Sequence, residues 1–207
     1  MRKVVAIVFL LFSGVSVKAQ LEVGLKATLM QSDIGLADLE SVNVSEVTIN
    51  NKLGFKAGLT SRVTILKFYI QPEFVFTQFN AEINATNTDG LEQNNYYLLH
   101  RFDVPILAGV KLSDFRFYAG PVASFNLNSA TPMFGETWQK GSWNFLAGVG
   151  YAVKKFELGV FYEWATENYA ERAIITIGNE VYDVPLTVKN SNFGFSLGYF
   201  FESKFTN

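Results

Sequence analysis

Residues 101–112 read RFDVPILAGVKL, and large apolar side chains recur at every second position of this stretch. Phe102, Val104 and Ile106 begin the apolar series, whereas the charges of Arg101 and Asp103 fall between them. Successive side chains of a β-strand point to opposite faces of the sheet. A period of two therefore predicts a strand with one apolar face and one polar face.

Seven other segments repeat this alternation, and no charged residue within them falls on the apolar face. The predicted strands lie near residues 21–29, 53–63, 68–76, 102–112, 115–125, 143–153, 156–164 and 193–201. Regular short strands without a helical period predict an all-β domain of about eight strands.

The two faces of these strands differ in bulk. Phe, Trp, Tyr, Leu and Ile crowd the apolar face, and most strand glycines lie on the polar face. The interior of an eight-stranded barrel has little room, so glycine is favoured there. We therefore predict a closed antiparallel up-and-down transmembrane β-barrel with a polar lumen and aromatic side chains facing lipid. A soluble lipocalin-like carrier, with the aromatic side chains inside, is the alternative.

Short and long connections alternate along the chain. The predicted connections are tight turns at residues 65–67, 113–114 and 154–155, and long polar segments at residues 31–52, 80–94, 128–141 and 167–190. Bacterial outer-membrane barrels have short periplasmic turns and long external loops. With an even strand number, this pattern predicts that both the N- and C-termini are periplasmic.

Two features depart from a regular barrel. Residues 173–188 are partly apolar and β-branched, and we expect an external hairpin there rather than two more membrane strands, which would make ten. Pro72, Pro105 and Pro121 fall inside predicted strands. Since proline has no backbone N–H, each predicts a local bulge or a lost ladder bond.

The N-terminus has the parts of a secretory signal. Arg2 and Lys3 precede an apolar run over residues 4–12, and Val17-Lys18-Ala19 fits a signal peptidase site. We predict a signal peptide over residues 1–19 and a barrel domain over residues 20–207. The predicted location is the bacterial outer membrane. The expected partners are outer-membrane lipid, lipopolysaccharide and the barrel-insertion machinery.

Composition argues against several classes of site. The chain has no Cys, a single His and a net charge of -2, so metal sites, cofactors and nucleic acid are not expected. His100 is predicted to face lipid near the external rim, on the opposite face from Asp103 and Ser124. A Ser-His-carboxylate site would need these groups on one side, so we expect no enzyme.

Charges on the lumen face form the candidate site. The predicted network contains Lys26, Lys56, Arg62, Glu73, Arg101, Asp103 and Glu163, with Glu22, Lys111, Arg116 and Glu157 on the same face. Arg62 and Glu73 are expected on neighbouring strands at similar heights. Buried charges persist when they are paired, so we expect a structural salt-bridge network in a non-conducting lumen. A narrow ion or proton path is the alternative.

The chain resembles the PorT-like outer-membrane β-barrel family of Bacteroidota. The similarity covers the mature chain and rests on Phe102-Asp103-Val104-Pro105, on Tyr118-Ala119-Gly120-Pro121, and on the aromatic stretch over residues 195–201. The resemblance implies a membrane barrel and no particular activity. We therefore expect a structural, adhesion or surface-interaction protein. A pore or an accessory component of an outer-membrane transport or secretion system is the alternative.

Overall fold

The computed structural model describes residues 20–37, 44–51, 53–87, 92–127, 141–166, 170–177 and 180–202. The strands are β1 (Gln20–Ala37), β2 (Val44–Asn51), β3 (Leu53–Ile65), β4 (Phe68–Asn87), β5 (Glu92–Leu112), β6 (Phe115–Asn126), β7 (Gly141–Val153), β8 (Phe156–Ala165), β9 (Ala170–Ile177) and β10 (Glu180–Glu202). None of these ranges contains a helix with the length and apolar character of a membrane span. The signal peptide predicted for residues 1–19 lies outside the described residues.

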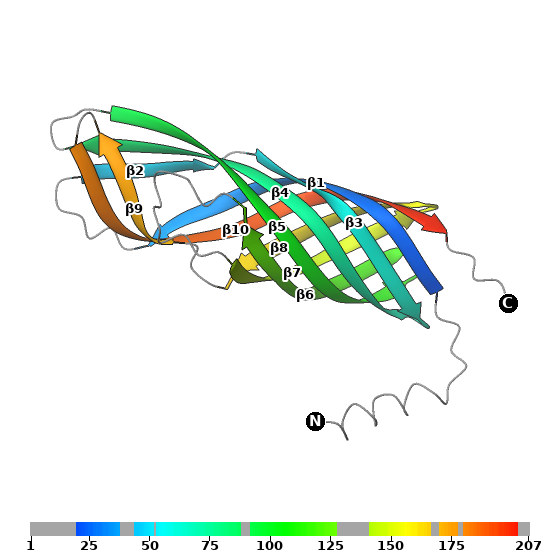
Figure 1. The fold of residues 1–207 in the computed structure, drawn as a ribbon. Coiled ribbons are helices and arrows are strands. Elements are labelled where there is room, and N and C mark those ends of the chain that lie inside the picture. The colour runs from blue at the N-terminus through cyan, green and yellow to red at the C-terminus, as the bar shows by residue number, and fades with distance from the viewer. Residues whose placement is uncertain are drawn as a thin grey trace, which may run out of the picture.

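Eight strands close into a barrel, as predicted (Figure 1). The ring runs β1-β3-β4-β5-β6-β7-β8-β10, and β10 pairs with β1 to close it. Every pairing is antiparallel. β2 and β9 lie outside the ring, because β2 pairs with β4 and β9 pairs with β10. The segment 173–188 is therefore a hairpin that extends the barrel, and it adds no strand to the ring.

The stagger of the ring sets the tilt of its strands. Following paired residues once around the barrel leads from Gln20 back to the same strand at Met30, ten residues further along. With the usual rise and strand spacing, this stagger implies a strand tilt of roughly 40° to the barrel axis.

Three two-residue turns lie at one end of the barrel, where they were predicted. They occupy residues 66–67, 113–114 and 154–155. Leu66, Ser113 and Lys154 have φ values of 59°, 55° and 56°, which non-glycine residues rarely adopt. β1 begins and β10 ends on the same side, since Glu22 pairs with Glu202. We call this the turn end and the opposite side the loop end.

Each proline interrupts the sheet on one side only. Pro72 is paired with β5 but not β3, Pro105 with β6 but not β4, and Pro121 with β7 but not β5. The register is the same on both sides of each gap, so ladder pairing is lost there without a bulge. Both backbone groups of an antiparallel residue point to the same neighbour. A missing N–H therefore weakens one ladder and spares the other.

The predicted direction of the side chains is confirmed. Leu25 and Phe115 on the outer face are 50% and 48% exposed, whereas Arg101 and Asp103 in the lumen are fully buried. Outward aromatic side chains gather in two girdles separated by Ala, Leu, Ile and Val. The turn-end girdle contains Phe68, Phe115, Tyr151, Phe156 and Phe201, and the loop-end girdle contains Phe76, Trp143, Phe145, Trp164 and Phe193. This arrangement is typical of membrane barrels.

The barrel wall is much taller on one side at the loop end (Figure 1). β4, β5 and β10 have 20, 21 and 23 residues, against 12 and 10 for β6 and β8. The sequence predicted polar connections over residues 31–52, 80–94 and 167–190, but most of these residues are in strands. The connection predicted over residues 128–141 lies almost wholly outside the described residues.

Candidate functional site in the barrel lumen

Large side chains in the lumen lie over glycines of the neighbouring strand. The pairs are Tyr69 with Gly109, Tyr118 with Gly148, and Phe161 with Gly194. A Cβ atom at Gly109 would lie 2.3 Å from the Tyr69 ring, so only glycine fits there. The lumen is therefore partly aromatic and not polar throughout, which differs from the sequence prediction.

Four buried charges form a closed ring near the loop end, which we call the loop-side cluster. Arg101 lies 2.6 Å from Asp103 and 2.9 Å from Glu163, measured between nitrogen and oxygen. Lys56 lies 2.5 Å from Glu163 and 3.4 Å from Asp103. Each cation thus contacts both carboxylates. The two positive and two negative charges compensate one another where water is excluded.

Neutral side chains complete the coordination of the two carboxylates. Asn144 and Asn192 donate hydrogen bonds to Glu163 at 2.8 Å and 3.4 Å, and the Thr77 hydroxyl donates to Asp103 at 2.6 Å. Ser32 donates to the Asn192 side-chain oxygen, and Ser124 accepts from Asn144. These residues and the four charges come from all eight strands of the ring. The loop-side cluster therefore cross-braces the whole barrel.

A second group, the turn-side cluster, contains Glu22, Lys26, Arg62, Glu73 and Glu157. Lys26 pairs with Glu73 at 2.8 Å. Arg62 contacts both oxygens of Glu157, at 2.8 Å and 2.9 Å, and lies 3.8 Å from Glu22. The Lys26, Glu157 and Glu22 side chains are 14%, 11% and 25% exposed, so this cluster is more open than the loop-side cluster.

Aromatic rings support the central arginine of the turn-side cluster. The Arg62 guanidinium carbon lies 4.8 Å from the Tyr69 ring centroid and 4.3 Å from that of Phe200. A cation over an aromatic face is attracted by the ring quadrupole. The Arg62 guanidinium is therefore held by two rings as well as by carboxylates.

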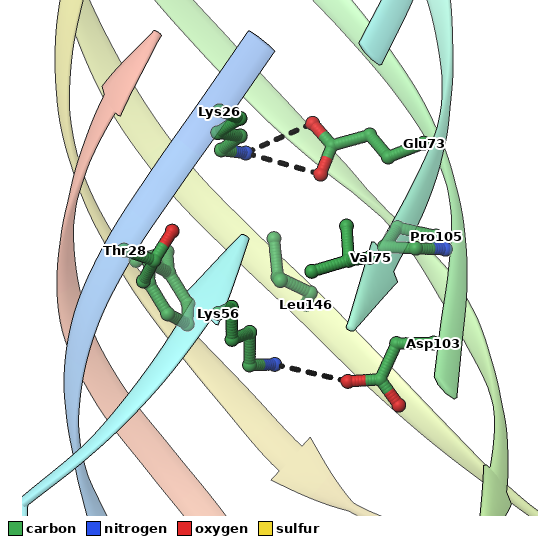
Figure 2. A pocket seen from close by; sticks show the side chains of 9 residues that line it. Lys26, Thr28, Lys56, Glu73, Val75, Asp103, Pro105 and Leu146 are labelled. Carbon is green, nitrogen blue, oxygen red and sulfur yellow. Dashed lines mark hydrogen bonds and ion pairs between the residues drawn. The ribbon is translucent and has the colours of Figure 1, made fainter. Parts of the chain in front are cut away.

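An apolar belt lies between the two clusters. Val75, Val122, Leu146 and Phe161 are at most 5% exposed and project into the lumen. Figure 2 shows Val75 and Leu146 between the Lys26–Glu73 and Lys56–Asp103 pairs. The cavity at this level measures about 20 Å³. A cavity of this size holds about one water molecule, so the lumen is closed at mid-height.

Comparison with known proteins agrees with this architecture. A family model described as the outer membrane protein beta-barrel domain matches residues 15–169, more than half of the chain. This chain belongs to that family. It is an outer-membrane β-barrel protein.

Solved outer-membrane barrels are similar to this chain at low sequence identity. Ail of Yersinia pestis, solved in complex with a heparin analogue, is 15% identical over 88% of this chain and 99% of that chain, with a TM-score of 0.44. AlkL is 11% identical over 89% and 92%, with a TM-score of 0.48, and neisserial surface protein A is 15% identical over 88% and 99%, with a TM-score of 0.42. No curated protein matches the chain significantly.

Each of the seven charged residues singled out in the sequence lies in the lumen of this outer-membrane barrel. Lys56, Arg101, Asp103 and Glu163 form one cluster, while Lys26, Arg62 and Glu73 belong to the other. Arg62 and Glu73 do not pair directly. Gln71 links them, because it accepts a hydrogen bond from Arg62 at 2.7 Å and donates one to Glu73 at 2.6 Å.

Other expectations about individual residues have mixed outcomes. Lys111 was expected inside the lumen but is exposed at the turn end. His100 lies on the outer face as expected, with its ring 5.4 Å from that of Phe76. The sequence reasoning missed Gln71, Asn144 and Asn192. Their places on the lumen face followed from the alternation, but uncharged amides carried no signal that singled them out.

The charged side chains of the lumen bind one another and brace the described strands. His100 faces away from the lumen carboxylates. In the part of the chain that the structure describes, no three His, Cys, Asp or Glu residues are grouped as metal ligands would be. The acidic side chains of the loop-side cluster already accept bonds from several donors. This arrangement fits a structural plug in the barrel.

Proposed function

We propose that this outer-membrane barrel is a surface-interaction protein of the structural or adhesion type. A transmembrane β-strand needs ~9–11 residues to span the hydrocarbon core. β4 and β5 have 20 and 21 residues, so about half of each strand extends past the membrane. The single observation that carries the proposal is this tall sheet at the loop end, which a barrel with a purely anchoring role would not need.

The tall sheet also offers backbone groups for contact. In the described ladders, the β5–β6 pairing begins at Arg101. Residues 92–99 of β5 are therefore paired on one edge, with β4. A strand edge of this kind can pair with an extended segment of another protein. This edge is therefore the part of the sheet that we expect to contact a partner.

The closed lumen favours a surface-interaction barrel over a pore. The apolar belt and the cavity of about 20 Å³ leave no room for a column of water between the two clusters. A narrow pore is the competing proposal, and an accessory role in transport or secretion is compatible with a closed barrel. We propose no catalytic activity for the chain.

The orientation and biogenesis of the barrel follow from the same proposal. We propose that the loop end faces outward towards lipopolysaccharide, that both termini are periplasmic, and that residues 1–19 are removed during export. The barrel-insertion machinery would then assemble the mature chain. We also propose membership of the PorT-like branch. Two of the sequence motifs, over residues 102–105 and 118–121, lie side by side in the fold and support this membership. Pro105 pairs with Val122, next to Pro121.

Trimming the tall sheet tests the proposed function. Asn80 and Leu98 lie opposite each other in the β4–β5 ladder, so residues 81–97 can be replaced by Asn-Gly without changing the register below. Bacteria displaying each form are applied to immobilised collagen, fibronectin, mucin and heparin. We expect wild-type cells to be retained on at least one surface and the trimmed variant to be released.

A matched control removes a similar length of chain elsewhere. Replacing residues 128–140 by a short Gly-Ser loop leaves every described strand intact and should preserve retention. Heat-dependent gel migration reports whether each variant still forms a closed barrel. Equal retention of wild-type and trimmed cells, or a steady conductance of the wild type in planar bilayers, would count against the proposal.

A further inference from the structure

Among the side chains with a described environment, the exposed charges gather at the turn end. Among the side chains that the structure describes, five charged ones are exposed, and all five lie in or beside the two-residue turns. They are Lys67, Lys111, Asp114, Lys154 and Lys155. Four positive charges and one negative charge thus surround one mouth of the barrel. We call the four lysines the lysine collar.

Backbone bonds join the three turns into one rim. The Lys67 carbonyl accepts a hydrogen bond from the Lys111 amide at 2.7 Å, which brings two collar residues together. The Lys155 carbonyl accepts one from Phe200 at 2.8 Å, and Asp114 accepts one from Ala152 at 2.8 Å. Because each turn is tied to the next strand, the lysines are presented from fixed backbone positions.

Aromatic side chains place the lysine collar at the edge of the membrane. The Lys67 ammonium lies 5.7 Å from the Phe68 ring centroid, and Phe115 packs against Tyr151 at 5.1 Å in the same girdle. Aromatic girdles of membrane proteins lie at headgroup level. Lysine side chains beside such a girdle extend their ammonium groups into the headgroup layer.

We propose that the lysine collar binds the phosphates of anionic phospholipid headgroups in the leaflet that surrounds the turn end. A ring of lysines attracts any anionic membrane surface, and each lysine near the surface strengthens the attraction. The two-residue turns keep the lysines close to the headgroup layer. The collar would thereby fix the height of the barrel and favour a phospholipid leaflet at this end.

Lipid counting on the intact barrel tests the proposal. The full mature chain, folded in detergent, is mixed with equal amounts of phosphatidylglycerol and phosphatidylcholine, and bound lipids are counted by native mass spectrometry. We expect a preference for phosphatidylglycerol of roughly tenfold, on the scale of one or two lysine–headgroup contacts. The variant K67Q/K111Q/K154Q/K155Q should bind both lipids equally.

Two matched variants separate charge from structure. The replacement of all four lysines by arginine keeps the charge and should keep the preference. K52Q/K140Q/R172Q/K189Q removes four cations outside the collar and should also keep it. Heat-dependent gel migration confirms that each variant is folded. If the fourfold Gln variant fails to fold, K67Q/K111Q and K154Q/K155Q are measured separately and should each lose part of the preference.

Three results would overturn the proposal. The first is an unchanged lipid preference in folded Gln variants, and the second is a loss of preference in the variant that lacks the four cations outside the collar. The third comes from adding lipid A to the mixture. Displacement of phosphatidylglycerol by lipid A from the wild type, but not from the Gln variant, would assign the collar to the lipopolysaccharide leaflet.

Discussion

The two charged clusters of the lumen compensate their buried charges in different ways. The loop-side cluster is a closed ring of four ions, each at most 7% exposed, and its hydrogen bonds reach every strand of the barrel. The turn-side cluster is a branched chain in which Glu22 and Lys26 keep partial access to water. The apolar belt separates them.

This difference determines how each cluster should respond to the loss of one charge. In the loop-side cluster water cannot replace a missing carboxylate, so its partners stay buried and uncompensated. In the turn-side cluster, Arg62 keeps Glu22, Gln71 and two aromatic rings when the Glu157 charge is lost. The first cluster is thus expected to be a structural unit, and the second to be tolerant.

Glu163→Gln should have the largest effect. Glu163 contacts both cations of the ring and both amides, so its neutralisation leaves Lys56 and Arg101 to share Asp103. Breaking a buried ion pair lowers the free energy of unfolding by about 3–5 kcal/mol. The change is measured by urea titration of the folded band on gels, with the barrel in lipid vesicles.

A compensating change sharpens this prediction. In K56M/E163Q one cation and one carboxylate remain, and Arg101 still pairs with Asp103 at 2.6 Å. The double variant should therefore recover most of the lost stability. If Glu163→Gln unfolded at the same urea concentration as the wild type, the loop-side cluster would not be a structural unit.

Leu146→Ala should have the next largest effect. Leu146 is 5% exposed in the belt and lines the cavity of about 20 Å³. Removing a buried leucine side chain lowers the free energy of unfolding by about 2–5 kcal/mol, through lost burial and a larger cavity. The same urea titration measures it. Leu158→Ala, on the lipid face of β8, is the control and should cost less in the same titration, because lipid fills the space that the side chain leaves.

Glu157→Gln should have a smaller effect than either. Arg62 loses its closest carboxylate but keeps its other contacts and some access to water. The expected loss is about 1–2 kcal/mol, below the value for a fully buried pair. Since the belt separates the clusters, the losses from Glu157→Gln and Glu163→Gln should add within about 0.5 kcal/mol. A larger coupling between them would mean that the belt does not isolate the clusters.

The sequence was sufficient to predict which face most barrel residues occupy, with Lys111 at the turn end as an exception. A strand in lipid has apolar side chains at every second position. Phe102 and Val104 therefore indicate the outer face, and Arg101 and Asp103 between them indicate the lumen face. The strand extensions were missed for the same reason. Beyond the membrane no lipid imposes the alternation, and residues 81–87 and 92–99 therefore resemble a polar loop.

Pairing inside the lumen was beyond the reach of the sequence. Arg62 and Glu157 are 95 residues apart, and their contact depends on the stagger of the closed ring. Height alone suggested Arg62 and Glu73 as partners, but Gln71 lies between them. The aromatic residues Tyr69 and Tyr118 were missed because their rings fit only over glycines of the next strand, which the alternation cannot reveal.

Pro121→Ala should have the smallest effect on the free energy of unfolding. It should also add a backbone hydrogen bond between β6 and β5. The new N–H can donate to β5, and a net hydrogen bond contributes about 0.5–1.5 kcal/mol. Loss of proline also frees the unfolded chain by about 0.4–1 kcal/mol, which offsets the gain. The free energy of unfolding should therefore change by less than about 1 kcal/mol.

Hydrogen exchange at residue 121 distinguishes two causes of the interrupted pairing between β5 and β6, namely the missing N–H of proline and the packing of the lumen. If the missing N–H alone interrupts the ladder, the new amide should exchange as slowly as that of Ala123, which the described ladders pair on both sides. A fast amide at residue 121 would show that the strands are held apart there by the lumen packing. In that case the interrupted ladders beside Pro72 and Pro105 would also reflect the shape of the barrel, because the three gaps lie on adjacent strand pairs.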